Sequence, residues 1–182
     1  MADWRTTLYP YFRPFIRGQV YGIMTEDDLD QECYDLAVRA IAAFKFPRIS
    51  TEYITYYAVR DKETGKLIAI TPDDERFGDA ISYGEFVNQI TQAEIDIIVA
   101  WMKVYWCEAQ ISNADNFEDM YTDSNIKTYS RANAVAQNLK LMAEFRTYAR
   151  DLETRYSRTK NYKPTIGDIH SEDTEEDNDD NL

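Results

Sequence analysis

The chain has 182 residues, of which 44% are apolar and 14% aromatic, and its formal net charge is −13. This length suits one domain with extensions or a small two-part domain, and the apolar content excludes a chain that is disordered throughout. The acidic balance argues against a general nucleic-acid-binding protein. No run of about 18 apolar residues occurs, and the N-terminus lacks a basic-then-apolar pattern, so we expect neither membrane binding nor export.

The first segment, residues 1–24, is aromatic and interrupted by Pro and Gly, and it has neither helical nor clean strand periodicity. Proline removes a backbone donor and biases its predecessor toward extended geometry, so an extended arm is predicted. Because aromatic residues and arginine are enriched where proteins meet, the arm should be buried on the body or on a neighbouring subunit. Its candidate partner-binding residues are Trp4, Tyr9, Tyr11, Phe12, Arg13, Phe15 and Arg17.

A helix is predicted to begin at Thr25, whose side chain can cap the backbone ahead of three acidic residues. Apolar residues then recur at helical spacing as far as Phe44, and Pro47 ends the pattern. Residues 51–71 contain two runs of strand formers around a turn, which predicts a β-hairpin. An isolated hairpin is marginal in water, so it needs a sheet, a helix or a partner beneath it. Residues 71–84 are predicted to form a loop.

Residues 85–163 contain no Gly and no Pro, which favours nearly continuous helix. Thr91 and Glu94 form a capping-box pattern. The helix that follows is apolar on almost every face, which is typical of the central helix of a fold. The polar and acidic stretch at 113–129 is expected to hold a break in the helix.

The last helix is predicted to run from about Ser130 to about Lys160. Its apolar residues recur at intervals of three and four, so they form a single stripe. They are Val135, Leu139, Met142, Phe145, Ala149, Leu152 and Tyr156. Thirty helical residues span about 45 Å, more than a domain of this size requires. We therefore expect the far end of this helix to project beyond the body.

Charge changes sign near Pro164. Residues 131–163 carry eight Lys or Arg against three acids, whereas residues 168–182 carry eight acids and no base. Without those eight acids, 25 acids face 20 bases, so the body is only weakly acidic. The basic residues either form the solvated back of a helix or contact a negative surface, which could be DNA or the acidic tail of a neighbouring copy. The candidate binding residues are Arg146, Arg150, Arg155, Arg158, Lys160 and Tyr162.

The sequence contains no recognisable catalytic or metal-binding pattern. The single histidine, His170, lies beside the acidic tail, and the glycines match no phosphate-binding fingerprint. Cys33 and Cys107 lie 74 positions apart on apolar helix faces, where reduced, buried thiols are expected. We therefore predict a protein that is not an enzyme and that uses no cofactor or metal.

Three parts of the chain carry a resemblance to a known family. They are LAVRAIAAFKFPRI at 36–49, ITQAEI and AWMKVYW within 90–106, and NFEDMY and KTYSRAN within 116–133. Over about residues 25–165 the chain resembles the head-to-tail connector (neck or adaptor) proteins of tailed bacteriophages. The resemblance implies a helical bundle that forms a ring, often of twelve copies, beneath the portal in the virion neck, after synthesis in the host cytoplasm. It also implies contacts with the portal and with other neck or tail proteins, while DNA passes through the ring without sequence-specific binding.

The predicted fold is mainly α. It is a bundle of three to four helices at residues 25–163, with a long C-terminal helix, a small β-hairpin insertion at 51–71, an extended N-terminal arm at 1–24 and an acidic tail at 164–182. The predicted function is a virion structural protein that forms a ring between portal and tail. The alternative is a soluble acidic inhibitor, or DNA mimic, whose carboxylates imitate phosphates and act on a nucleic-acid-binding partner. A third reading, an enzyme of carboxylate chemistry, requires a deep pocket lined with paired acids.

Overall fold

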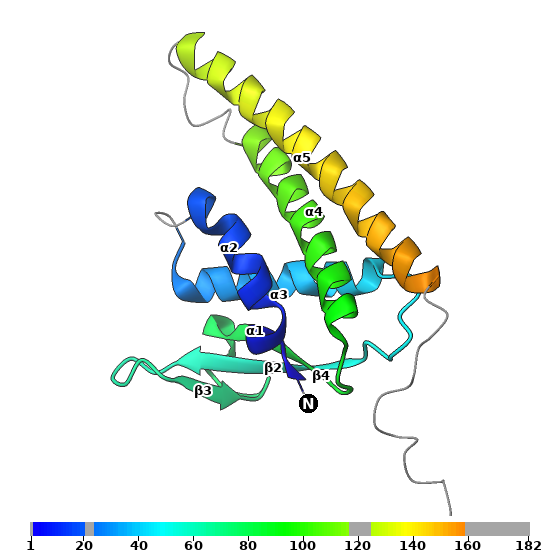
Figure 1. Ribbon diagram of the computed structural model, residues 1–182. Coiled ribbons are helices and arrows are strands. Elements are labelled where there is room, and N and C mark those ends of the chain that lie inside the picture. The colour runs from blue at the N-terminus through cyan, green and yellow to red at the C-terminus, as the bar shows by residue number, and fades with distance from the viewer. Residues whose placement is uncertain (1, 21–23, 117–124, 159–182) are drawn as a thin grey trace, which may run out of the picture.

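The computed structural model describes residues 2–20, 24–116 and 125–158, and the side chains of 2–16, 24–112 and 135–158. The helices are α1 (Trp4–Thr7), α2 (Tyr9–Val20), α3 (Glu26–Ala43), α4 (Gln92–Asn116) and α5 (Asn125–Arg158), with a 3-10 turn η1 (Phe77–Asp79). The strands are β1 (Ala2–Asp3), β2 (Tyr53–Arg60), β3 (Leu67–Ile70) and β4 (Ile81–Phe86). Figure 1 shows the sheet at one end, α3 lying across it, and α4 and α5 rising together away from it.

The predicted helical bundle is wrong, because the fold contains a four-stranded antiparallel sheet in the order β1-β4-β2-β3. The hairpin of β2 and β3 is confirmed, with Tyr57 opposite Ile70 and Arg60 opposite Leu67. The sequence analysis missed β1 and also β4, which begins within the predicted loop at 71–84 and pairs with β2 along its length. Ser82 and Gly84 are poor strand formers, so the segment resembles a loop until its non-local pairing is known.

The N-terminal segment is also not an extended arm. After β1 pairs with β4, the chain forms α1 and then α2, with Pro14 inside the second helix. Apolar side chains recur at every fourth residue, which places them on one helical face. They are Trp4, Leu8, Phe12 and Ile16, each 0% exposed. These side chains belong to the core of their own chain.

Trp4 fixes how this segment meets the sheet. Its ring lies 4.7 Å from that of Tyr53 and 5.4 Å from that of Phe86, measured between centroids. A Cβ atom on Gly84 would approach the Trp4 ring to 2.5 Å. Gly84, which made β4 resemble a loop in the sequence, therefore allows the Trp4 indole to pack directly against the strand.

The start of α3 follows the prediction. Thr25 and Asp28 form a capping box, in which the Asp28 amide donates to Thr25 Oγ1 at 3.1 Å. The apolar face of α3 is buried, and Tyr34 connects it to the sheet through a 2.8 Å hydrogen bond with Thr55. Gln31 Oε1 accepts from the Ser82 amide at 2.8 Å and so satisfies a donor of β4. The helix thus holds the sheet against the rest of the molecule.

The prediction of a central helix is confirmed for α4. Its side chains are buried on several faces between α2, α3 and α5, including Ile98, Met102 and Trp106. Helix α5 begins at Asn125, earlier than predicted, and its 34 residues span about 50 Å. It packs antiparallel along α4, and Figure 1 shows the far part of this helical hairpin standing clear of the other described elements.

Candidate interaction surface

Several aromatic residues predicted to bind a partner are inside the fold. Trp4, Tyr9 and Phe12 are at most 1% exposed, so they cannot contact another molecule without unfolding of the segment. Tyr11 is different: half of it is exposed, and its hydroxyl donates to Gln92 Oε1 at 3.2 Å. The sequence analysis could have separated Trp4 and Phe12 from Tyr11, because Trp4 and Phe12 share a spacing of four with Leu8 and Ile16 and Tyr11 does not.

The remaining predicted residues of this segment also serve the fold. Phe15 packs edge-on against Phe145 of α5, with ring centroids 5.1 Å apart. Arg13 and Arg5 both form ion pairs with Asp30, a carboxylate that is only 6% exposed. The side chains of Arg17, Lys160 and Tyr162, which were also predicted to bind partners, lie outside those that the structure describes.

The arginine cluster holds α1 and α2 on α3, because Arg5, Arg13 and Asp30 come from these three helices. Burial raises the pKa of the adjacent Cys33 thiol to about 12, and it also raises the pKa of Tyr9. Cys33 therefore stays a neutral, buried thiol at ordinary pH. The prediction of buried thiols is confirmed, since Cys33 and Cys107 are both buried and free.

The apolar stripe of α5 is covered unevenly. Ala149 is 0% exposed and Tyr156 is 9% exposed, so the last part of the helix is packed into the body. Leu139, nearer the start of the helix, is 47% exposed. Apolar surface is therefore exposed on the part of the hairpin where no other described element packs against α4 and α5.

A buried carboxylate fixes the end of α5. Glu94 is 0% exposed, and its Oε1 atom accepts from the Tyr156 hydroxyl at 2.5 Å and from the Ile49 amide at 3.2 Å. Its other oxygen accepts from the Thr91 amide at 2.8 Å, which confirms the predicted capping box. Burial, together with the bond to Glu94, raises the pKa of Tyr156 to about 12. One carboxylate thus joins α5, the start of α4 and the segment after α3.

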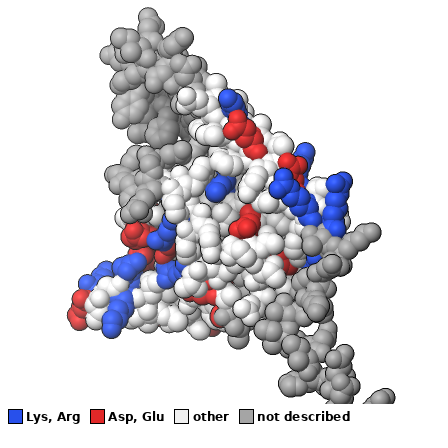
Figure 2. Space-filling view, viewed as in Figure 1, with Lys and Arg blue, Asp and Glu red and all other residues white. Residues whose placement is uncertain are grey.

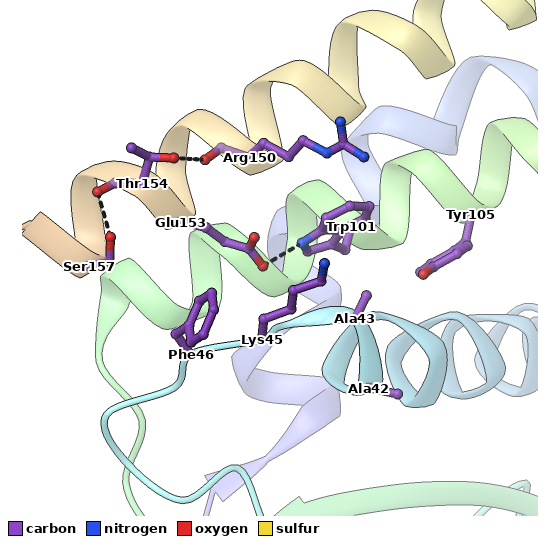
Figure 3. Close-up of a pocket in the computed structure, with 10 residues that line it drawn as sticks. All are labelled: Ala42, Ala43, Lys45, Phe46, Trp101, Tyr105, Arg150, Glu153, Thr154 and Ser157. Carbon is purple, nitrogen blue, oxygen red and sulfur yellow. Dashed lines mark hydrogen bonds between the residues drawn. The ribbon is translucent and has the colours of Figure 1, made fainter.

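A groove of about 540 Å³ lies beside this junction, between the end of α3, α4 and the last turns of α5. In Figure 3 the Trp101 indole lies in its middle and donates to Glu153 Oε1, at 3.0 Å. Lys45 and Arg150 extend toward the indole from the two sides of the groove (Figure 3). Phe46, which is 67% exposed, adds an open apolar side chain.

The predicted basic residues of α5 fall partly on this groove. Arg150 lines it, Arg155 and Arg158 are exposed on the last turns of the helix, and Arg146 is half-buried. Figure 2 shows several positive side chains along the lower part of α5. The sequence analysis missed Lys45, Phe46 and Trp101, because only the fold brings the segment after α3 and helix α4 next to α5. The groove therefore combines an aromatic surface with positive charge.

A second hollow, of about 430 Å³, opens beside the arginine cluster. Its arginines already face acids: Arg60 forms an ion pair with Asp27, and Arg13 forms ion pairs with Asp30 and Glu26. This neutralisation leaves little positive charge for a ligand. Among the described residues, no group of three or more His, Cys, Asp or Glu could hold a metal ion. Within the same ranges, no helix is both long and apolar enough to span a membrane.

Comparisons of the chain with protein-family models, with curated proteins and with solved structures find no match. The functional argument therefore rests on the geometry of the chain. That geometry offers an open apolar stripe on a projecting helical hairpin and an aromatic, basic groove at the base of the same hairpin. Both are features through which a protein contacts other protein surfaces.

Proposed function

We propose that this protein is a non-enzymatic virion subunit that assembles into a ring and connects the portal to the tail of a phage particle. The observation that carries the proposal is the uneven covering of α5. In the apolar stripe of α5, Ala149 and Tyr156 are buried, whereas Leu139 is exposed to solvent. The stripe lies on the hairpin of α4 and α5, which extends away from the body (Figure 1). A neighbouring copy would close it.

The energetic reason is the cost of leaving such a surface in water. Burying a side chain such as Leu139 fully contributes about 1.5–3 kcal/mol relative to exposure. In a head-to-tail contact the Leu139 surface of one copy meets a different surface of the next, such as the sheet, where Ile54 is 42% and Ile68 is 40% exposed. Head-to-tail contacts give closed rings when the rotation between copies closes.

The charge of the chain agrees with a ring through which DNA passes. Positive surfaces bind DNA through its phosphates, and that binding strengthens as salt falls. A net charge of −13 disfavours such retention and favours free passage. The resemblance to head-to-tail connectors, given above on three sequence stretches, supplies the specific place in the particle.

The DNA-mimic alternative has weaker support. A mimic needs unpaired acids on one rigid face, whereas several described acids are paired with arginine. Examples of these pairs are Asp27 with Arg60, Asp74 with Arg76, and Glu108 with Arg39. The densest run of acids lies in residues 168–182, outside the described part of the chain.

Electron microscopy of the purified chain, alone and mixed with a portal protein, tests the proposal. We expect ring-shaped particles with one rotational symmetry, bound end-on to the portal. Particles of single-chain size that do not associate with the portal would contradict it.

A further inference from the structure

We propose that the acidic tail of this chain, residues 168–182, docks in the groove around Trp101 of the same chain. This contact goes beyond the proposed ring, because it occurs within one molecule and requires no neighbour. The groove lies between α3, α4 and α5, and the tail follows α5 directly in the sequence.

Unpaired positive charge is the first argument. Described arginines elsewhere, such as Arg39, Arg60 and Arg76, form ion pairs with acids. Within the described part of the chain, the side-chain nitrogens of Lys45 and Arg150 form no hydrogen bond or ion pair, although they flank the same groove. Glu153 also lines the groove and keeps its negative charge while its Oε1 atom accepts from the Trp101 indole. The side chains of Lys45, Arg150 and Glu153 thus give the groove a net charge of +1.

The shape of the groove suits an extended chain segment. Its floor is the Trp101 indole, 8% exposed, and Phe46 stands open at its edge. Arginine binds carboxylates through two parallel hydrogen bonds, and lysine attracts them as a point charge. A segment with many carboxylates, such as residues 168–182, could therefore place acids on both cations while its backbone crosses the indole.

Chain length allows the tail to reach the groove. Ser157 lines the groove, and α5 ends at Arg158. Nine residues, 159–167, separate that end from the first acid of the tail, Asp168. Nine extended residues span about 30 Å, whereas Arg150 lies about 12 Å back along the helix axis. Because the tail is tethered beside its site, its effective concentration there is high, of millimolar order.

Charge also selects this occupant. The tail carries eight acids and no Lys or Arg, and on α5 Arg146 lies one turn from Arg150 and Arg158 lies next to Ser157, two residues that line the groove. Interactions between exposed charges are screened by salt, so docking should weaken as ionic strength rises. A tail held in this way would cover the base of the hairpin until a competing acidic segment displaced it.

The experiment measures binding of a labelled peptide, residues 164–182, by fluorescence anisotropy. The peptide is titrated against the chain truncated after residue 163 and against the full chain. Light scattering at the same concentrations gives the oligomeric state of each chain. We expect the peptide to bind the truncated chain, and to bind the full chain about tenfold more weakly because its own tail occupies the groove. Equal binding to both chains would overturn the proposal, as would no binding to the truncated chain.

Two charge-reversal variants of the truncated chain locate the site. Lys45→Glu with Arg150→Glu changes the groove, and Lys62→Glu with Lys66→Glu makes the same charge change on the exposed hairpin turn. The groove variant should lose about tenfold or more in affinity and the control less than about twofold. Equal losses would show attraction to net charge alone and would contradict docking in the groove. Near-UV circular dichroism confirms that both variants are folded. If the chain forms no ring, this peptide-binding assay can still be carried out and its outcome does not change.

Discussion

The N-terminal segment and helix α5 look alike in sequence, but the fold uses them differently. Both combine aromatic residues with arginine, and both were predicted to bind partners. Phe12 of α2 packs against Trp106 of α4, with ring centroids 6.3 Å apart, and Trp4 is enclosed by the sheet and α3. Leu139 of α5 remains 47% exposed. Composition does not distinguish a core from an interface; the presence of a covering layer does.

The largest expected effect is on the segment that became core. Trp4→Ala removes a fully buried indole and should lower the free energy of unfolding by about 3–5 kcal/mol. The matched variant Tyr11→Ala, at a half-exposed position on the same segment, should cost less than about 1 kcal/mol. Guanidinium unfolding of both variants measures the difference. Similar losses would mean that the segment does not bury Trp4 as described.

The next effect tests how that indole meets the sheet. Gly84→Ala places a Cβ atom 2.5 Å from the Trp4 ring and should cost about 1–3 kcal/mol through the displacement it forces. Gly78→Ala is the control, because a Cβ atom there meets nothing within 4 Å. Urea unfolding should separate the two variants. A destabilised Gly78 variant with an unaffected Gly84 variant would contradict the packing of Trp4 on β4.

The closed end of α5 supplies a third prediction. Tyr156→Phe removes the hydroxyl that donates to the buried Glu94 carboxylate at 2.5 Å, so stability should fall by about 1–3 kcal/mol. Tyr148→Phe, at an exposed position of the same helix, should have almost no effect. The two midpoints of urea unfolding at pH 8 test this. Equal midpoints for Tyr156→Phe and the wild type would show that the hydrogen bond from Tyr156 to Glu94 does not stabilise the fold.

The same hydroxyl predicts a pH dependence. The pKa of Tyr156 is raised from 10.0 to about 12 in the folded chain. A raised pKa means that the hydroxyl's contribution is complete below about pH 10 and is lost as the pH rises through about 12. The stability difference between wild type and Tyr156→Phe should therefore narrow between pH 9 and pH 11.5. A constant difference over that range would contradict the raised pKa.

The smallest effect on stability is expected at the open end of α5. Leu139→Asp should change the free energy of unfolding of the single chain by less than about 1 kcal/mol, because the side chain is already half exposed. It should nevertheless weaken association strongly, since it places a charge in the proposed contact. Gln137→Asp adds the same charge at another exposed position of α5 and should associate normally. Sedimentation velocity compares the two, and equal association would exclude the Leu139 surface as the contact.

Local sequence signals predicted a good part of this fold. Capping residues such as Thr25 and Thr91, and the spacing of apolar residues in α3, α4 and α5, act within one helix and are visible in the sequence. Strand β4 was not predictable in the same way, since Gly84 becomes a strand residue only through pairing with β2 and contact with Trp4. Prolines concealed the helical spacing of the N-terminal segment.

The candidate surface shows the same difference between signals within one helix and contacts between elements. Arg150 was found from the basic pattern of a single helix. The groove could not be found, because Lys45, Trp101 and Arg150 come from three elements that are far apart in the sequence. Likewise, the capping role of Glu94 was evident from Thr91, whereas its bond to Tyr156 spans 62 positions. Contacts between elements need the fold, and these contacts form the proposed sites.

The mass of the wild-type chain in solution tests the central claim most directly. Multi-angle light scattering over a hundredfold range of concentration should give one large species, an integral multiple of the 21.3 kDa chain, that dissociates in the Leu139→Asp variant. A wild-type chain that stays at 21.3 kDa at every concentration, alone and with a portal protein, would contradict the account.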